Sequence, residues 1–140
     1  MEGVFTEREQ IVEIVNKLFV YTDNQEWTKL QEEVFTQTIT IDMVSMGAQR
    51  PEQVSSREIC YRWEEAFQDL DAVHHQAGNY LVKIQSEEAD VYAYSIATHY
   101  RANVKKGKVK EFVGSYDLHL IKSYGDWRID KFKYNLKYSV

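Results

Sequence analysis

The second half of the chain is predicted to form four long strands joined by short turns, and this pattern limits the possible folds more than any other feature. The strands are expected over residues 75–85, 89–105, 109–123 and 127–138, which are rich in β-branched and aromatic side chains. The connecting stretches "QSEEAD", "KKGK" and "YGD" are polar or contain glycine, as hairpin turns do. These segments predict a mainly antiparallel sheet of consecutive hairpins.

In the first half of the chain, capping-box spacing marks the start of two helices. Thr6 and Glu9 precede one stripe of apolar residues at helical spacing, and Ser55 and Glu58 precede another. In such a box the side chain of the first residue accepts from the backbone of the second. We therefore expect one helix to begin after Thr6 and a second to begin after Ser55 and end near Asp71.

A further helix and a strand are expected between these two helices. The helix would begin directly after Asp23, capped by Asp23 or Asn24, and continue to about residue 35. The stretch "TITIDMVS", residues 38–45, alternates apolar and polar positions and predicts a half-buried strand. Three N-terminal helices packed on a strongly curved sheet make an α+β fold with a cone-shaped interior, in a single domain over residues 1–140.

Composition and charge exclude several classes of protein. The hydrophobic share of 44% and the aromatic share of 14% exclude a disordered chain. The net charge of −5 argues against nucleic acid or an anionic membrane surface as a partner. The lone Cys60 cannot form an internal disulfide, and no apolar run is long enough to span a bilayer. We therefore expect a cytoplasmic protein with no membrane contact.

Alternation along two strands indicates which side chains share a face. Small residues that end in a histidine occupy the odd positions of the strand over 89–105 and suit a face that leaves room for a ligand: Val91, Ala93, Ser95, Ala97 and His99. The next strand divides into one set with Ser115, Asp117 and His119 and another with Phe112, Gly114, Tyr116 and Leu118. A bulge in either strand would shift this assignment.

Several strings, taken in order, resemble the SnoaL-like branch of the NTF2-like superfamily, and scytalone dehydratases in particular. They are "YTDNQEW" at the end of the first helix, "ITIDM" in the first strand, "HHQAGN" at the entry to the sheet, and then "ATHYRA", "GSYDLHLIK" and "GDWRI". Each string is weak alone, but their order and spacing cover nearly the whole chain. The resemblance implies a cone-shaped α+β barrel with a pocket inside.

The resemblance also implies a set of acid and base residues. Scytalone dehydratases use an aspartate that is hydrogen-bonded to a histidine, together with a second histidine. The matching positions here are Asp23, His99 as its partner, and His75 as the second histidine. Histidine suits proton transfer because its unperturbed pKa lies near neutrality. A histidine on a sheet is nevertheless more often structural, and an aspartate at a helix junction is more often a cap.

Other pocket positions match that family only in part. Its serine and asparagine on a late strand correspond to Ser115 and Asp117. Its two tyrosines, which hold a water molecule that activates the substrate, correspond to Thr22 and Met43. Tyr21, one residue before Thr22, could replace one of them. The resemblance thus implies a substrate-binding set that includes Tyr21, Met43, Ser115 and Asp117.

The residue types leave little reason to expect a metal or a cofactor. Trp63 and Phe67 are expected in the core, with their edges forming an apolar wall for a flat ligand. The adjacent His74 and His75 would point to opposite faces of a strand, which is poor geometry for a shared metal ion. The sequence contains no glycine-rich phosphate loop. We expect His75 to face the interior and His74 to face outward.

Three functions stay open at this point. The first is a cofactor-free lyase (dehydratase) or isomerase/cyclase for a small aromatic or polycyclic hydroxy-carbonyl compound, with catalytic Asp23, His75 and His99. The second is a non-catalytic small-molecule binding protein, which the loss of both tyrosine positions favours. The third is an accessory subunit resembling the small subunit of ring-hydroxylating dioxygenases, which predicts a filled cone. Outward aromatic residues favour a homo-oligomer, a dimer or a trimer, in every case: Tyr92, Tyr94 and Tyr100.

Overall fold

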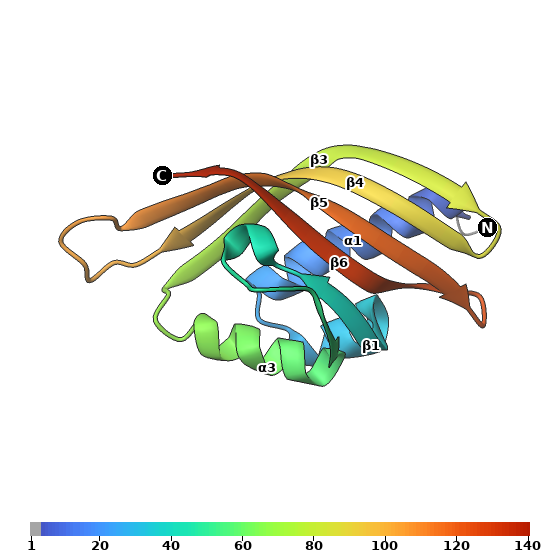
Figure 1. Cartoon of the computed structure of the whole chain (residues 1–140), viewed down its shortest axis with the longest axis horizontal. Coiled ribbons are helices and arrows are strands. Elements are labelled where there is room, and N and C mark those ends of the chain that lie inside the picture. The colour runs from blue at the N-terminus through green and yellow to red at the C-terminus, as the bar shows by residue number, and fades with distance from the viewer. Residues whose placement is uncertain (1–3) are drawn as a thin grey trace.

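A six-stranded mixed sheet forms the framework of residues 4–140, the part of the chain that this computed structural model describes (Figure 1). Its strand order is β2-β1-β6-β5-β4-β3. The bounds are β1 (Phe35–Asp42), β2 (Glu52–Ser55), β3 (Ala72–Gln85), β4 (Glu88–Tyr100), β5 (Val109–Ser123) and β6 (Asp126–Ser139). Strands β3 to β6 form the predicted antiparallel hairpins, whereas β1 runs parallel to β6 and antiparallel to β2.

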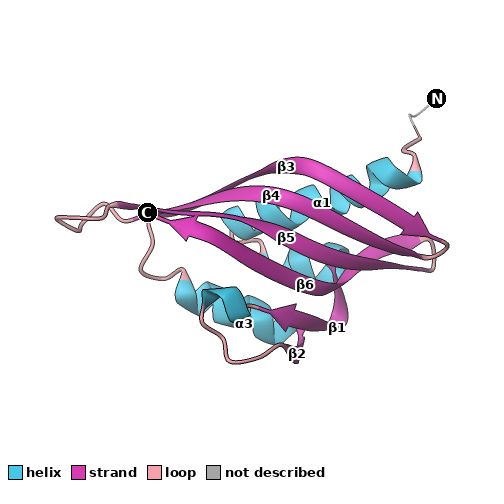
Figure 2. Ribbon diagram, turned by 45° about the horizontal axis from the view of Figure 1, so that its top comes forward, coloured by secondary structure: helices cyan, strands magenta, loops and turns pink. Residues whose placement is uncertain are grey.

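The helices lie together on one side of the curved sheet (Figure 2). They are α1 (Glu7–Asp23), α2 (Trp27–Lys29) and α3 (Ser56–Ala66) in the described residues. Helix α1 packs against β3 and β6, and α3 packs against β1. The sheet curls around the helices but does not close, because β2 and β3 are its free edges. This arrangement confirms the predicted α+β fold.

Both predicted helix starts are confirmed. The Thr6 hydroxyl accepts from the backbone N–H of Glu9 at 3.1 Å, and the Ser55 hydroxyl accepts from the backbone N–H of Glu58 at 3.0 Å. The Thr6 backbone N–H in turn donates to the Glu9 carboxylate at 3.2 Å, which completes a capping box. These bonds satisfy backbone groups that would otherwise lack partners in the first turn of α1 and α3.

The second helix is shorter than the sequence predicts. Helix α2 passes directly into a π-helical turn, η1 (Leu30–Val34). Among the described residues no side chain caps the start of α2, because the Asp23 carboxylate is hydrogen-bonded to β3 instead. Leu30 and Val34 are fully buried, so packing against the core stabilises a segment whose local signals are weak.

A short edge strand, β2, was not predicted. It follows Pro51 and pairs with β1, so that Val54 lies opposite Ile39. Both of these side chains are buried. Four residues are too few for the alternation of apolar and polar positions to stand out from a loop. Only the pairing with β1 identifies this strand.

The hydrophobic core lies between α1 and the inner face of the sheet. Helix α1 contributes Ile11 and Val15, and the sheet contributes the fully buried Leu120, Trp127 and Ile129. Complete burial of such a side chain stabilises the fold by about 1.5–3 kcal/mol. These residues fill the space beside the first half of α1. The space beside its last turn is left for a cavity.

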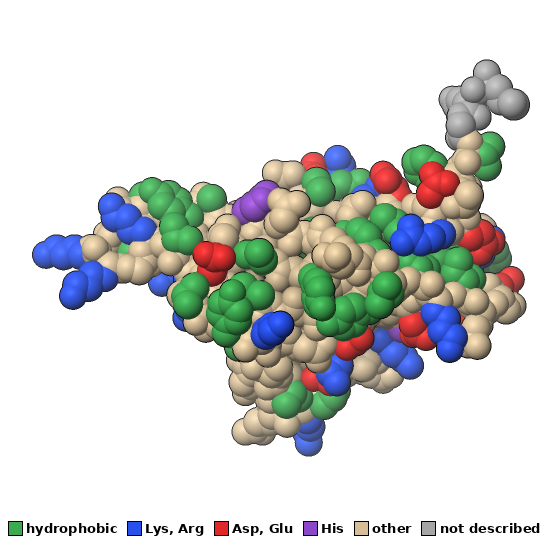
Figure 3. Space-filling model, turned by 90° about the horizontal axis from the view of Figure 1, so that it is seen from above, with side chains coloured by type: hydrophobic (Ala, Val, Ile, Leu, Met, Phe, Trp, Pro, Cys, Tyr) green, Lys and Arg blue, Asp and Glu red, His purple; other side chains and the backbone are tan. Residues whose placement is uncertain are grey.

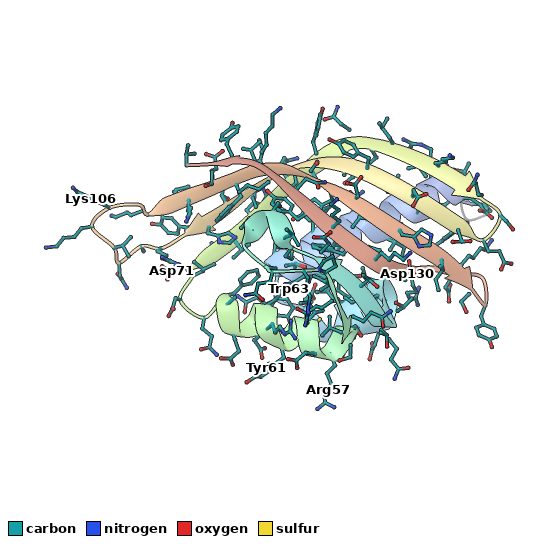
Figure 4. The ribbon with its side chains drawn as sticks, in the orientation of Figure 1. Arg57, Tyr61, Trp63, Asp71, Lys106 and Asp130 are labelled. Atoms are coloured by element: carbon teal, nitrogen blue, oxygen red, sulfur yellow. The ribbon has the colours of Figure 1, made fainter. Side chains whose placement is uncertain are left out.

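None of the helices in residues 4–140 is long and apolar enough to cross a membrane. The turn between β4 and β5 projects from the body and carries Arg101 and several lysines, including Lys106 (Figures 3 and 4). The basic side chains of this turn are exposed, and they lie far along the sheet from the core.

Candidate active site

A cavity of about 190 Å³ lies between the last turn of α1, helix α3 and the inner face of the sheet. Its wall is mainly aromatic. Trp63 comes from α3 and Phe67 is the residue that caps the end of this helix, and Figure 4 shows Trp63 between the helix and the sheet. Met43, in the loop after β1, also lines the cavity. These three residues lie where the sequence and the resemblance led us to expect them.

Asp23 and His75 form a hydrogen-bonded pair at the wall of this cavity. Asp23 is the last residue of α1, which packs along β3. Its Oδ1 accepts from the ring Nδ1 of His75 at 2.6 Å, and its Oδ2 accepts from the His75 backbone N–H at 2.8 Å. Only 14% of the Asp23 side chain and 11% of the His75 side chain are exposed. His75 is therefore held at two points, its ring and its backbone, with the opposite ring nitrogen free to face the cavity.

The predicted pairing of Asp23 with His99 is wrong. In the register of β3 and β4, His75 lies opposite Ala97, whereas His99 lies opposite Val73. The end of α1 docks beside His75, so the carboxylate reaches that ring. His99 still lines the cavity. Matching of residue types places both histidines in the pocket, but the strand register and the helix position decide which one contacts Asp23.

His99 lies in an apolar part of the cavity wall. Its ring centroid is 6.0 Å from that of Phe67 and 5.0 Å from that of Phe112. Burial lowers the pKa of His99, and the charges of His75, Arg101 and Lys110 lower it further, against a smaller opposing effect of Asp23. His99 is therefore neutral at neutral pH.

His74 lies on the opposite side of the strand from His75. Its side chain is 68% exposed, and its Nδ1 is 3.9 Å from Asp23 Oδ2. Adjacent residues of a strand point to opposite faces, which explains why one histidine of the pair faces the cavity and the other faces solvent.

Ser115 and Asp117 do not face the cavity, contrary to what the resemblance implied. They lie opposite Tyr94 and Tyr92 of β4, on the outer face of the sheet. There the side-chain amide of Asn135 donates to Ser115 Oγ at 3.3 Å and to Asp117 Oδ2 at 2.8 Å. The inner face of β5 carries the other parity set, which includes Phe112 and Tyr116.

Tyr21 is also turned away from the cavity. Its hydroxyl donates to the Glu33 carboxylate at 3.1 Å, and the Lys29 ammonium lies 5.4 Å from its ring centroid. Thr22 lines the cavity instead, with its hydroxyl bonded to the Leu18 carbonyl oxygen at 2.6 Å. Tyr21 is therefore no replacement for the tyrosines of the related family.

Two tyrosines that the sequence did not single out do line the cavity. Tyr116 of β5 and Tyr134 of β6 lie side by side, with ring centroids 4.9 Å apart. The pairing of Ala93 with Tyr116 explains why: a small residue on the inner face of β4 leaves room for a large neighbour. The parity pattern of β5 contained this signal, but its two sets could not be assigned to a face.

The charge of the cavity wall is low. Among residues 4–140, no lysine or arginine lines it. Within the same residues there is also no group of three or more histidine, cysteine, aspartate or glutamate side chains placed to hold a metal ion. The polar groups that the wall itself offers include the His75 imidazole, held by a carboxylate, with a second imidazole and two phenols nearby.

Solved structures from other proteins share this fold. Protein Kfla4162 from Kribbella flavida is 25% identical, covers 96% of this chain and 93% of its own, and has a TM-score of 0.91. A candidate scytalone dehydratase from Novosphingobium aromaticivorans is 15% identical, with coverage of 96% and 86% and a TM-score of 0.80. A type 3 hexachlorocyclohexane dehydrochlorinase from Novosphingobium barchaimii is 11% identical, with coverage of 95% and 88% and a TM-score of 0.77.

Sequence comparison adds the family. No curated protein matches this chain. The model of a family described as the SnoaL-like domain matches residues 4–133, which is nearly the whole chain. The fold of helices on a curled sheet agrees with that match. The chain therefore belongs to the SnoaL-like domain family.

Proposed function

We propose that the chain is a cofactor-free lyase that removes water from a small, neutral hydroxy-carbonyl compound. One observation carries the proposal: the Asp23 carboxylate holds His75 at the wall of an otherwise aromatic cavity. Isomerisation or cyclisation of such a compound would begin with the same removal of a proton. Names of structural neighbours, a dehydratase and a dehydrochlorinase, are compatible with an elimination.

The pair can act as a general base in the following way. Because Asp23 accepts the proton of Nδ1, the lone pair of His75 Nε2 is free. Nε2 takes a proton from the carbon next to the carbonyl group, and the electron pair of that C–H bond forms an enolate. The enolate then expels the hydroxyl group from the neighbouring carbon. The proton on Nε2 passes to this hydroxyl group, which leaves as water, and the base is restored.

His99 would assist as a neutral group. Its lowered pKa keeps the ring uncharged, so it can donate one N–H to a substrate oxygen without repelling a protonated His75. Proton transfer by a positioned base typically accelerates a reaction by about 10²–10⁴-fold. Asp23, His75 and His99 are thus the proposed catalytic residues, with Met43, Trp63 and Phe67 forming part of the binding wall.

The size and charge of the cavity limit which compounds could be its substrate. A volume of about 190 Å³ is below the range of roughly 300–1,000 Å³ that is usual for sites of drug-sized ligands. This favours one ring over a polycyclic compound. A charged substrate would lack a counter-charge, because no described lysine or arginine lines the wall. A neutral single-ring hydroxy-ketone fits both limits.

The test is turnover of a panel of single-ring 3-hydroxy-ketones, beginning with 3-hydroxycyclohexanone and followed by the ultraviolet absorbance of the enone product. We expect His75→Gln to lower kcat/KM at least about 100-fold. His74→Gln is the matched control, since that neighbouring side chain faces solvent, and its kcat/KM should stay within about twofold of the wild type. Full activity of His75→Gln would contradict the proposal.

A small-molecule binding protein is the second candidate. The absence of tyrosine at Thr22 and Met43 favours it. It predicts that the panel compounds bind with saturation and are not converted, and that His99→Ala leaves their affinity unchanged. The accessory-subunit hypothesis predicted a filled cone, and the cavity between α1 and the sheet does not favour it.

We also propose that the protein forms a homo-oligomer through the outer face of its sheet. Ile96 lies opposite Val113, which lies opposite Tyr138, and the side chains of Ile96 and Tyr138 are exposed together with that of Tyr94. An apolar row of this kind suits a second copy of the chain. Light scattering after size exclusion should give the mass of a dimer or trimer, and Ile96→Lys should lower that mass.

A further inference from the structure

A cluster of three hydroxyl groups lies on the inner face of the sheet beside the cavity: Ser95, Tyr116 and Tyr134. Ser95 is 3% exposed and Tyr134 is 4% exposed. Neither the Ser95 hydroxyl nor the Tyr134 hydroxyl has a hydrogen-bond partner among residues 4–140. A buried hydroxyl without a partner costs about 1–3 kcal/mol, and native proteins rarely leave one unexplained.

Strand register brings these hydroxyl groups together. Ser95 lies opposite Gly114, which has no side chain to fill the inner face. The Tyr134 hydroxyl occupies this gap, 2.6 Å from the position that a Cβ atom on Gly114 would take. Because side chains directly opposite in a sheet have Cβ atoms about 5 Å apart, Ser95 borders the same gap. The Ser95 and Tyr134 hydroxyl groups therefore both lie beside Gly114 on the inner face of the sheet.

The cluster lies within reach of a molecule that also contacts His75. Ser95 precedes Ala97 by two positions on the inner face of β4, and Ala97 lies opposite His75. Two residues along a strand span about 7 Å. The Phe19 ring contacts both His75 and Tyr116: its centroid lies 5.5 Å from that of the His75 ring and 5.1 Å from that of the Tyr116 ring. Both phenol rings also line the cavity.

Both phenols are hydrogen-bond donors at neutral pH. Burial raises the pKa of Tyr116, and the neighbouring Tyr134 and the charge of Asp23 raise it further. Ser95 acts in the opposite direction, as expected of a hydroxyl group close to Tyr116. Burial also raises the pKa of Tyr134. Neutral phenols in a dry pocket can stabilise a negatively charged oxygen without taking up its charge.

We propose that Tyr134, Tyr116 and Ser95 form the oxygen-binding end of the site, where they hold the carbonyl oxygen of a ligand whose other end faces His75. The inference rests on the proposed function for its chemical meaning: when His75 takes the proton, negative charge grows on that oxygen, and the hydroxyl groups donate hydrogen bonds to it. No proton leaves the tyrosines. The three hydroxyl groups that would bind the oxygen come from β4, β5 and β6. In the related family, by contrast, the tyrosines of the pocket stand at the positions of Thr22 and Met43.

The first test measures binding, so that it does not depend on turnover. The carbonyl stretching frequency of ¹³C-labelled cyclohex-2-en-1-one, bound to the whole protein, reports hydrogen bonds to its oxygen. We expect a lower frequency in the wild type than in Tyr134→Phe or Tyr116→Phe. Tyr94→Phe is the matched control, because that phenol lies on the outer face next to Ser95, and it should match the wild type. Equal frequencies in all variants, or no saturable binding to the wild type, would overturn the inference.

The second test separates binding from a structural role. Tyr134→Phe removes a hydroxyl group that has no protein partner, so its Tm should equal or exceed that of the wild type, while kcat/KM for a converted hydroxy-ketone falls about 100-fold. Ser95→Ala should show the same pattern with a smaller loss. A lower Tm with unchanged kcat/KM would show that the hydroxyl is structural. If His75→Gln keeps the shifted carbonyl frequency without turnover, the two ends of the site act independently, as proposed.

Discussion

The carboxylate of Asp23 holds His75 at two points, its ring and its backbone, with Oδ1 at 2.6 Å from Nδ1 and Oδ2 at 2.8 Å from the peptide nitrogen. The contact joins the last residue of α1 to the beginning of strand β3. An aspartate here sets both the position of the ring and the nitrogen that carries its proton. Neither a helix cap nor a surface ion pair would require this double contact.

We expect Asp23→Asn to lower kcat/KM by about 10²–10⁴-fold in the 3-hydroxy-ketone assay, because an amide NH₂ facing Nδ1 favours the tautomer with the proton on Nε2. Nitrogen-15 NMR of His75 should show this change of tautomer directly. Asp126→Asn, at the exposed first residue of β6, is the control. An unchanged tautomer together with full activity would refute the role given to Asp23.

His99 should make the protein less stable in mild acid. Burial lowers its pKa in the folded state below the value of about 6.5 in the unfolded chain. As the pH falls through 6.5, the unfolded chain binds the proton first, so the free energy of unfolding decreases. Urea unfolding at pH 7.5 and pH 5 should show a smaller decrease for His99→Gln than for the wild type. Equal decreases would contradict a buried, neutral His99.

In contrast to His99, His119 should make the protein less stable as the pH rises. Partial burial lowers its pKa, but the hydrogen bond and charge of Asp130 at 2.6 Å, the hydrogen bond of Glu88 at 2.9 Å and the charge of Asp90 outweigh this and raise it. The folded state therefore keeps the proton above pH 6.5, and the stability that this cluster adds is lost as the pH rises through the raised pKa.

The loss should stay below about 1 kcal/mol, because the cluster is partly exposed and screened by solvent. Urea unfolding at pH 6 and pH 8.5 measures it, and His119→Gln should remove this part of the pH dependence. The same slope in both proteins would show that the cluster contributes nothing to stability.

Gly114→Ala should destabilise the fold by about 1–3 kcal/mol. A Cβ atom there would overlap the backbone oxygen of Asn135 and lie 2.6 Å from the Tyr134 hydroxyl, and a backbone atom cannot move aside cheaply. Gly78→Ala is the matched control in the same sheet, since no described atom lies within 4 Å of its Cβ position. Thermal unfolding should separate the two variants by several degrees, and equal Tm values would contradict the close approach.

Much of the fold follows from local signals in the sequence. The strand predicted over residues 109–123 has those bounds, and Gly107 and Gly125 adopt the positive φ angles of 69° and 84° that the flanking turns require. The capping boxes of α1 and α3 are equally local. Strand β2 and the π-helical turn η1 were missed because pairing with β1 and burial in the core, rather than residue preference, hold them in place.

In the candidate site, too, some features follow from the sequence and others from tertiary contacts. Residue type and the family resemblance by themselves selected Asp23, His75 and His99, and strand alternation separated His75 from His74. The tertiary structure decided two features: which histidine contacts the end of α1, and which face of β5 points inward. Alternation with a period of two has two equivalent solutions, and only the register with β4 selects Tyr116 over Ser115. Contacts between distant segments are a property of packing, which no local pattern encodes.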